Sequence, residues 1–212
     1  DESTMTGLNA AGSAYVAVRK DLMFFAHLSN DNTTKDAYIT ERGSTINNKF
    51  VAFYGGGVKL INTLTSIQGD YPEISDIILA ANNSDTEASP YYSFAGPNRG
   101  LIFGTLGIVN NYGSSSKYAD LNDLANRQIN MAINRDGKTM LWGNFTSQVD
   151  DNQQKYVHIV RGMITLIKTL KPTLETFIEE PCMPQTWNSM YYSVKSFLDS
   201  LVGEFFHSYE WL

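Results

Sequence analysis

The fold of this chain is decided by one stretch, residues 129 to 146, which reads INMAINRDGKTMLWGNFT. Apolar residues dominate its first half and return after Lys138, and the polar tetrapeptide Arg135 to Lys138 stands between them. A short polar segment with Asp-Gly between two apolar runs is a hairpin signal. The stretch therefore predicts two strands, Ile129 to Asn134 and Thr139 to Thr146, joined by a tight turn.

Two long amphipathic helices are predicted after this hairpin, at about residues 153–180 and 184–209. In the first, apolar residues recur at helical spacing from Tyr156 to Leu170. Pro172 should kink or divide this helix, because proline has no backbone N–H to donate. The second helix carries a broad apolar stripe from Trp187 to Phe205. Stripes of this width predict helices that cover a sheet or another helix.

The upstream sequence alternates between strand and helix patterns. Residues 1–12 are small and polar, which predicts an entry loop, and residues 10–20 fit either a helix or a strand. The glycines at 55–57 indicate a bulge or a close approach of backbone. Residues 89–100 form an irregular aromatic loop. The expected strands are 21–28, 50–54, 58–61 and 101–109, and the expected helices are 34–42, 72–82 and 117–128.

This alternation predicts an α/β (α+β) layered domain, in which helices cover a mixed, partly parallel sheet and two of them are long and C-terminal. A length of 212 residues with 42% hydrophobic residues suits one large domain with a sizeable core. The first residue is Asp1 and the last three are Glu210 to Leu212. We expect a single core domain over 1–212 that belongs to a longer polypeptide.

Composition and charge exclude several kinds of partner. The net charge is -6 and the 16 basic residues are scattered, so a clustered basic face for nucleic acid is not expected. No apolar stretch approaches 18 residues, so direct membrane insertion is not expected either. A single cysteine, Cys182, excludes an internal disulfide, and with no matched histidine we expect a small residue at a helix junction.

Candidate chemical residues are few, and each has a simpler structural explanation. His27, His158 and His207 lie far apart and do not have metal-ligand spacing. The pair Asp150 and Asp151 precedes a helix and is explained by the helix dipole. No serine stands in a nucleophile-elbow pattern, and no phosphate-binding loop is present. We expect no catalytic residue, no metal and no cofactor.

Trp142 and Trp187 are the aromatic residues best placed to stack on a sugar or a base. Trp142 lies on a Trp-Gly strand and Trp187 lies at a helix start. Both positions favour anchoring in the core over ligand binding.

The order of motifs in the last third resembles a known family. The motifs are the asparagine-containing strand, the glycine turn, Trp142-Gly143 with Thr146, the helix start Tyr156 to Arg161, the element Phe177 to Pro181, and Thr186-Trp187. This order is similar to the C-terminal conserved domain of contractile-tail sheath proteins of bacteriophage tails, pyocin-type particles and related injection machines. The loop 93–100 also resembles a family loop, and the resemblance covers about residues 50–212, most closely 130–197.

Three positions depart from the family pattern. Gly162 stands where the family has the second arginine of a pair, Phe145 where it has an arginine, and Pro181 where it has an asparagine. These departures indicate a divergent member, such as one from a very large phage.

The resemblance implies a structural subunit that polymerises helically around a tail tube and contracts to drive the tube through a host envelope. Its implied partners are other copies of itself, the tail tube protein, and the baseplate and tail terminator proteins. It implies a place in the virion tail sheath, with assembly in the host cytoplasm. The candidate intersubunit contacts are Arg135, Lys138, Lys155, Arg161 and Lys168.

Two alternatives remain open at this point. The first is an α/β hydrolase-like enzyme with a site around residues 89–100, which requires a deep pocket with converging titratable groups. The second is another tail or baseplate structural protein, which predicts a fold dominated by β-strands.

Overall fold

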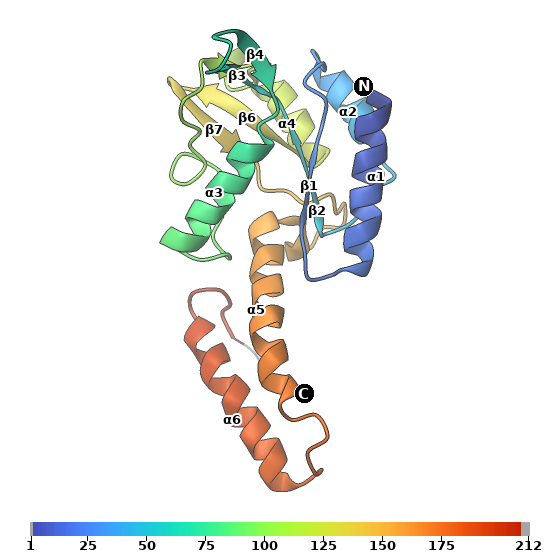
Figure 1. Cartoon of the computed structure of the whole chain (residues 1–212), viewed down its shortest axis with the longest axis vertical. Helices are drawn as coiled ribbons and strands as arrows, with labels where there is room; N and C mark the ends of the chain where they lie inside the picture. The colour runs from blue at the N-terminus through green and yellow to red at the C-terminus, as the bar shows by residue number, and fades with distance from the viewer. Residues whose placement is uncertain (1, 209–212) are drawn as a thin grey trace. The chain divides into compact units, whose positions relative to one another are not determined.

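The computed structural model describes residues 2–208, so the predicted helix end at Tyr209 and the terminal residues Glu210 to Leu212 lie outside it. The chain divides into two units, residues 1–161 and 162–212. The helices are α1 (Glu2–Val18), α2 (Lys35–Arg42), α3 (Ile74–Glu87), α4 (Tyr118–Asn126), α5 (Val157–Glu175) and α6 (Pro184–Leu201), with 3-10 turns at Ser115–Lys117 and Gln153–Lys155. The strands are β1 (Phe24–His27), β2 (Val51–Gly55), β3 (Val58–Ile61), β4 (Gln68–Tyr71), β5 (Gly107–Ile108), β6 (Ile129–Arg135) and β7 (Lys138–Trp142) (Figure 1).

The first unit is built on a four-stranded mixed sheet with the strand order β1-β2-β6-β7. Strands β1, β2 and β6 are parallel, and β7 pairs antiparallel with β6. Asp136 and Gly137 have φ values of 53° and 75°, the left-handed conformation that a two-residue hairpin turn requires. The predicted α/β class, mixed sheet and hairpin are confirmed.

The second hairpin strand is shorter than predicted. It ends at Trp142, four residues before Thr146, because Gly143 takes a φ of 102° and turns the chain out of the ladder. After this turn, Phe145 forms an isolated bridge with Tyr156.

Both faces of the sheet are buried, because successive side chains of each strand point to opposite faces. On one face, β6 contributes Ile129, Met131 and Ile133, which pack with residues of α2 and α4. On the other face, Ala132 of β6 packs with Ile77 of α3 and other apolar residues. The near-continuous apolar strands seen in the sequence follow from this double coverage.

A three-stranded antiparallel sheet, β4-β3-β5, follows the glycines at 55–57. A Cβ at Gly57 would lie 2.8 Å from the backbone oxygen of Tyr71 and 2.8 Å from the side chain of Asn30. The predicted close backbone approach is therefore confirmed. Here the chain leaves one sheet for the other, so residues 58–61 do not resume the strand before them.

Several local predictions are wrong. Residues 2–18 form one helix rather than a polar entry loop, with Val16 buried in the sheet core. Helix α3 continues to Glu87, five residues beyond the predicted end. Its buried face includes Ile77 and Ala81, but Ile78 is exposed. The apolar run 101–109 is mostly irregular, and only Gly107–Ile108 forms a strand there.

The second unit holds the rest of α5, from Gly162, and all of α6. Both helices are shorter than predicted, ending at Glu175 and Leu201. Pro172 lies inside α5 and does not divide it, since the helix runs three residues past it. Among the described residues of this unit, the buried apolar side chains are those of Ile164 and Val194. The stripes predicted from periodicity are therefore present, but most of their side chains in this unit are only half-buried.

Candidate assembly surface

The asparagine of the hairpin motif is a buried structural clamp. Asn130 donates its side-chain N–H groups to the carbonyl oxygens of Phe53, at 3.0 Å, and Phe145, at 2.8 Å. Its side-chain oxygen accepts the backbone N–H of Phe145 at 2.7 Å. A Cβ at Gly143 would lie 2.7 Å from that oxygen, so a larger residue at this position would displace the amide. The motif that suggested the family thus joins β2, β6 and the segment after β7.

A second buried cluster was not found by sequence reasoning. The guanidinium of Arg42 donates to the carbonyl oxygens of Arg127 and Ser147, each at 3.0 Å, and of Gly43, at 2.8 Å. It also lies 5.0 Å from the centre of the Phe53 ring. Burial and the charge of Arg127 lower the pKa of Arg42. Two of the three partners are backbone oxygens 85 and 105 residues away, so no local pattern marks this arginine.

Arg135 and Lys138, two of the candidate contact residues, lie at the β6–β7 turn. They face each other as the last pair of the hairpin ladder. The Arg135 guanidinium lies 4.8 Å from the Tyr118 ring centre and 4.5 Å from that of Trp142. Lys138 is exposed. Arg135 is therefore held by aromatic contacts within its own unit, whereas the Lys138 side chain faces solvent.

Lys155 and Arg161 lie on either side of the start of α5. Lys155 forms an ion pair with Asp151, which raises the pKa of the lysine and lowers that of the aspartate. Arg161 pairs with Asp85 of α3, and only 11% of its side chain is exposed. Its guanidinium also lies 5.0 Å from the centre of the Phe94 ring. Arg161 thus fastens α5 to α3 and to the loop after α3.

Lys168 is exposed on α5 in the second unit. The five candidates therefore do not form one cluster in the first unit: two lie at a turn, two lie near the start of α5, and Lys168 belongs to the other unit. Lys138 and Lys168 are the candidates with exposed side chains.

The histidines do not meet, and two of them make polar contacts inside the first unit. His27 Nε2 lies 2.8 Å from a carboxylate oxygen of Glu73, and both residues are buried. His158 Nδ1 contacts the side-chain amide of Asn144, and burial together with the charge of Arg161 lowers its pKa. His207 is exposed. Over residues 2–208, no group of three or more His, Cys, Asp or Glu side chains is placed to hold a metal ion.

The two tryptophans behave differently. Trp142 is half-buried and packs against the sheet core, as predicted. Trp187 is 59% exposed, so the predicted core anchoring is wrong for this residue. Cys182 is also exposed, between α5 and α6.

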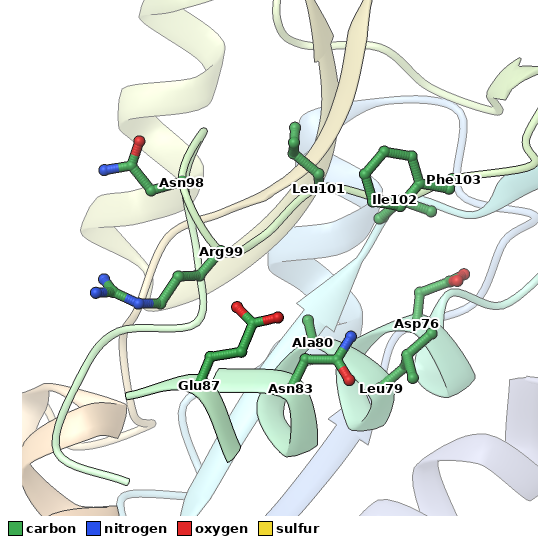
Figure 2. A pocket seen from close by; sticks show the side chains of 10 residues that line it. All are labelled: Asp76, Leu79, Ala80, Asn83, Glu87, Asn98, Arg99, Leu101, Ile102 and Phe103. Carbon is green, nitrogen blue, oxygen red and sulfur yellow. The ribbon is translucent and has the colours of Figure 1, made fainter. Parts of the chain in front are cut away.

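A pocket of about 280 Å³ lies beside the loop that the enzyme alternative requires. Figure 2 shows α3 on one side of it, with Asp76 and Glu87, and the irregular segment Asn98 to Phe103 on the other. Burial and the charge of Glu73 raise the pKa of Asp76. The guanidinium of Arg99 lies 4.8 Å from the ring centre of Tyr92. The lining residues include no serine, cysteine or histidine, so this pocket holds no Ser-His or Cys-His pair.

A search of the described helices finds none that is both long and apolar enough to cross a membrane. The β-dominated fold of the second alternative is not observed, because helices cover the sheet on both faces.

Comparison with solved structures places this fold among the subunits of contractile injection machines. One match is a chain of the anti-feeding prophage helical sheath in its contracted state, with a TM-score of 0.74 and 21% identity over 95% of this chain and 52% of the other. A second comes from the baseplate of the same particle, with a TM-score of 0.74 and 19% identity, covering 95% of this chain and 50% of the other. A third comes from the contracted sheath complex of an extracellular contractile injection system, PVC, with a TM-score of 0.71 and 19% identity, covering 88% and 50%.

The resemblance inferred from the motifs is thus confirmed at the level of fold. The chain spans about half the length of the solved chains it matches. No protein-family model matches the sequence, and no curated protein matches it.

Proposed function

We propose that this chain is the core of a structural subunit of a contractile sheath. Copies assemble helically around a tail tube, and contraction drives the tube through a cell envelope. The observation that carries the proposal is the match of 95% of the chain to a subunit of a contracted helical sheath at a TM-score of 0.74.

The residues that define the motifs support a structural role. Asn130 clamps three segments of backbone, and Arg161 pairs with Asp85 against an aromatic ring. These contacts stiffen the first unit instead of converging on a substrate-sized site. A stiff unit suits a machine whose subunits rotate or slide as rigid bodies while their interfaces switch between two arrangements.

The finer parts of the proposal are the partners and the particle. The partners are other copies of the chain, the tube protein, and the baseplate and terminator proteins at the two ends. In the bacteriophage version of the proposal, the subunit assembles in the host cytoplasm, is carried in the virion tail, and takes part in genome ejection. The solved matches, from the anti-feeding prophage and an extracellular injection system, support an injection particle equally well.

Electron microscopy tests the proposal directly. The protein that carries this chain is expressed alone, and the particles are imaged in negative stain. Hollow tubes with helical order are the expected result, because contracted sheath is the lower-energy assembly of such subunits. A protein that stays dispersed at all concentrations and salt conditions would refute the proposal.

A matched variant separates assembly from folding. Lys138→Glu reverses an exposed charge at the turn and should leave the fold intact. Under the proposed contact role of this lysine, tube formation falls while the thermal unfolding curve does not move. Unchanged tube formation would remove Lys138 from the contact set.

A further inference from the structure

We propose that helix α1 of one copy packs lengthwise on helix α5 of a second copy, through two exposed apolar stripes that the chain itself carries. This inference rests on the proposed function, since it names the surfaces by which copies meet. The stripe on α1 is Leu8, Ala11, Tyr15 and Val18, and the stripe on α5 is Ile167, Leu170, Leu174 and Ile178.

The α1 stripe consists of exposed residues, and two of them, Leu8 and Ala11, border a pocket that Phe24 and Ile74 of the same unit also line. Asn9 and Val16 are buried, and Asn9 donates to the carbonyl oxygen of His27 at the edge of the sheet. Leu8, Tyr15 and Val18 are each more than half exposed. The four stripe positions are spaced by three, four and three residues, which aligns them on one side of a helix.

The α5 stripe has the same periodicity. Ile167, Leu170 and Leu174 are spaced by three and four residues, and Ile178 follows just past the helix end. Ile167, Leu174 and Ile178 are exposed. Together with Leu166, Lys171 and Glu175, these residues line a shallow groove of about 450 Å³.

The two stripes fit each other in length and in shape. The ten steps from Leu8 to Val18 span about 15 Å of helix, and the seven steps from Ile167 to Leu174 span about 10 Å before Ile178 extends the stripe past the helix end. The α1 stripe has a small residue, Ala11, near its centre, and the α5 stripe has the large Leu170 in the corresponding place. Large-against-small pairing lets two helices approach closely.

The area involved decides what kind of contact this is. The exposed apolar side chains of the two stripes amount to on the order of 600 Å². A stable dimer buries about 1,200–2,000 Å² in total, so one such contact alone is weak. Repeated along an assembly, weak contacts add up because each copy is held by several neighbours at once.

The pairing of two different surfaces also matches the proposed architecture. Each copy offers α1 to one neighbour and α5 to another, so the contact is head-to-tail. Head-to-tail contacts that do not close into a ring generate open helical assemblies. A pairing of α5 with α5 would instead stop at a dimer.

Sedimentation equilibrium of the 212-residue chain, from about 10 µM to 1 mM, tests the contact. Leu8→Glu and Ile167→Glu each place a charge in one stripe, and each should weaken association at least about tenfold. The double variant should be no weaker than either single variant, because both substitutions remove the same contact. Val149→Glu, at another exposed apolar residue of the first unit, is the matched control and should leave association unchanged.

A photoreactive side chain at position 167, in a mixture of ¹⁵N-labelled and unlabelled chains, identifies the surface that α5 meets. Links from α5 to α1 between labelled and unlabelled chains are expected. Links confined to single chains, or links from α5 to α5, would overturn the proposal. So would a chain that remains monomeric at about 1 mM, or substitutions whose effects simply add.

Failure of this contact is distinguishable from failure of the sheath proposal. If Leu8→Glu and Ile167→Glu proteins form normal tubes in micrographs, the α1–α5 contact is wrong and the sheath role stands. If the unmodified protein forms no tubes, the sheath role is wrong whatever the sedimentation result.

Discussion

Replacing Asn130 by alanine tests the claim that the family motif is a structural clamp. The side chain makes three hydrogen bonds, of 3.0, 2.8 and 2.7 Å, and is fully buried. Each hydrogen bond contributes about 1 kcal/mol net. The bond to Phe53 is buried and the two bonds to Phe145 are half-buried. We therefore expect Asn130→Ala to lower the free energy of unfolding of the first unit by about 3 kcal/mol.

Urea unfolding followed by the fluorescence of Trp142 measures this loss, in a background where Trp187 and Trp211 are replaced by phenylalanine. Only the first unit is then observed. Asn134→Ala is the control on the same strand, because that half-buried side chain donates a hydrogen bond to Thr139 at 3.2 Å, and its loss should cost about 1 kcal/mol or less. A loss below about 1 kcal/mol for Asn130→Ala would refute the clamp.

Two further predictions concern α5. Arg161→Glu should lower the free energy of unfolding of the first unit by about 2–4 kcal/mol, because it places a second carboxylate next to Asp85 and removes the cation–π contact with Phe94. If urea unfolding shows no such loss while tubes fail to form, Arg161 acts between copies. The pKa of His158 is lowered in the folded protein from its ordinary value of 6.5. As the pH is lowered through 6.5, the unfolded state therefore binds a proton before the folded state does. The free energy of unfolding then decreases until the pH reaches the pKa of the folded protein. Urea unfolding at about pH 7.5 and 5.5 should show a larger loss for the unmodified chain than for His158→Gln, and equal losses would contradict this cause.

The location of the predicted cations shows why charge alone is a poor guide to a contact surface. Arg161 and Lys168 both appear on the polar side of one helical pattern. In the structure Arg161 is almost covered and paired with Asp85, whereas Lys168 is exposed. The difference comes from α3, which is more than 70 residues away in sequence and brings Asp85 to the start of α5. An arginine that is paired inside its own unit is less available to form an ion pair with another copy.

Sequence alone determined the hairpin, the α/β class and the two long helices, because these depend on local turn chemistry and on the period of apolar residues. A two-residue hairpin turn favours Asp-Gly because this pair tolerates positive φ, as Asp136 and Gly137 show, and the stripe on α5 follows from 3.6-residue periodicity. Such signals lie within one segment and need no distant partner.

Only the tertiary structure decided which of these surfaces are covered. Trp187 lies in an apolar stripe typical of a core, yet its side chain is exposed. Arg42 is a charged residue typical of the surface, yet it is buried against backbone oxygens from distant segments. Periodicity predicts that a helix has an apolar face, whereas the burial of that face depends on which other segment packs against it. That arrangement is set by long-range packing, and it leaves Leu8, Val18 and Ile167 of the two stripes exposed.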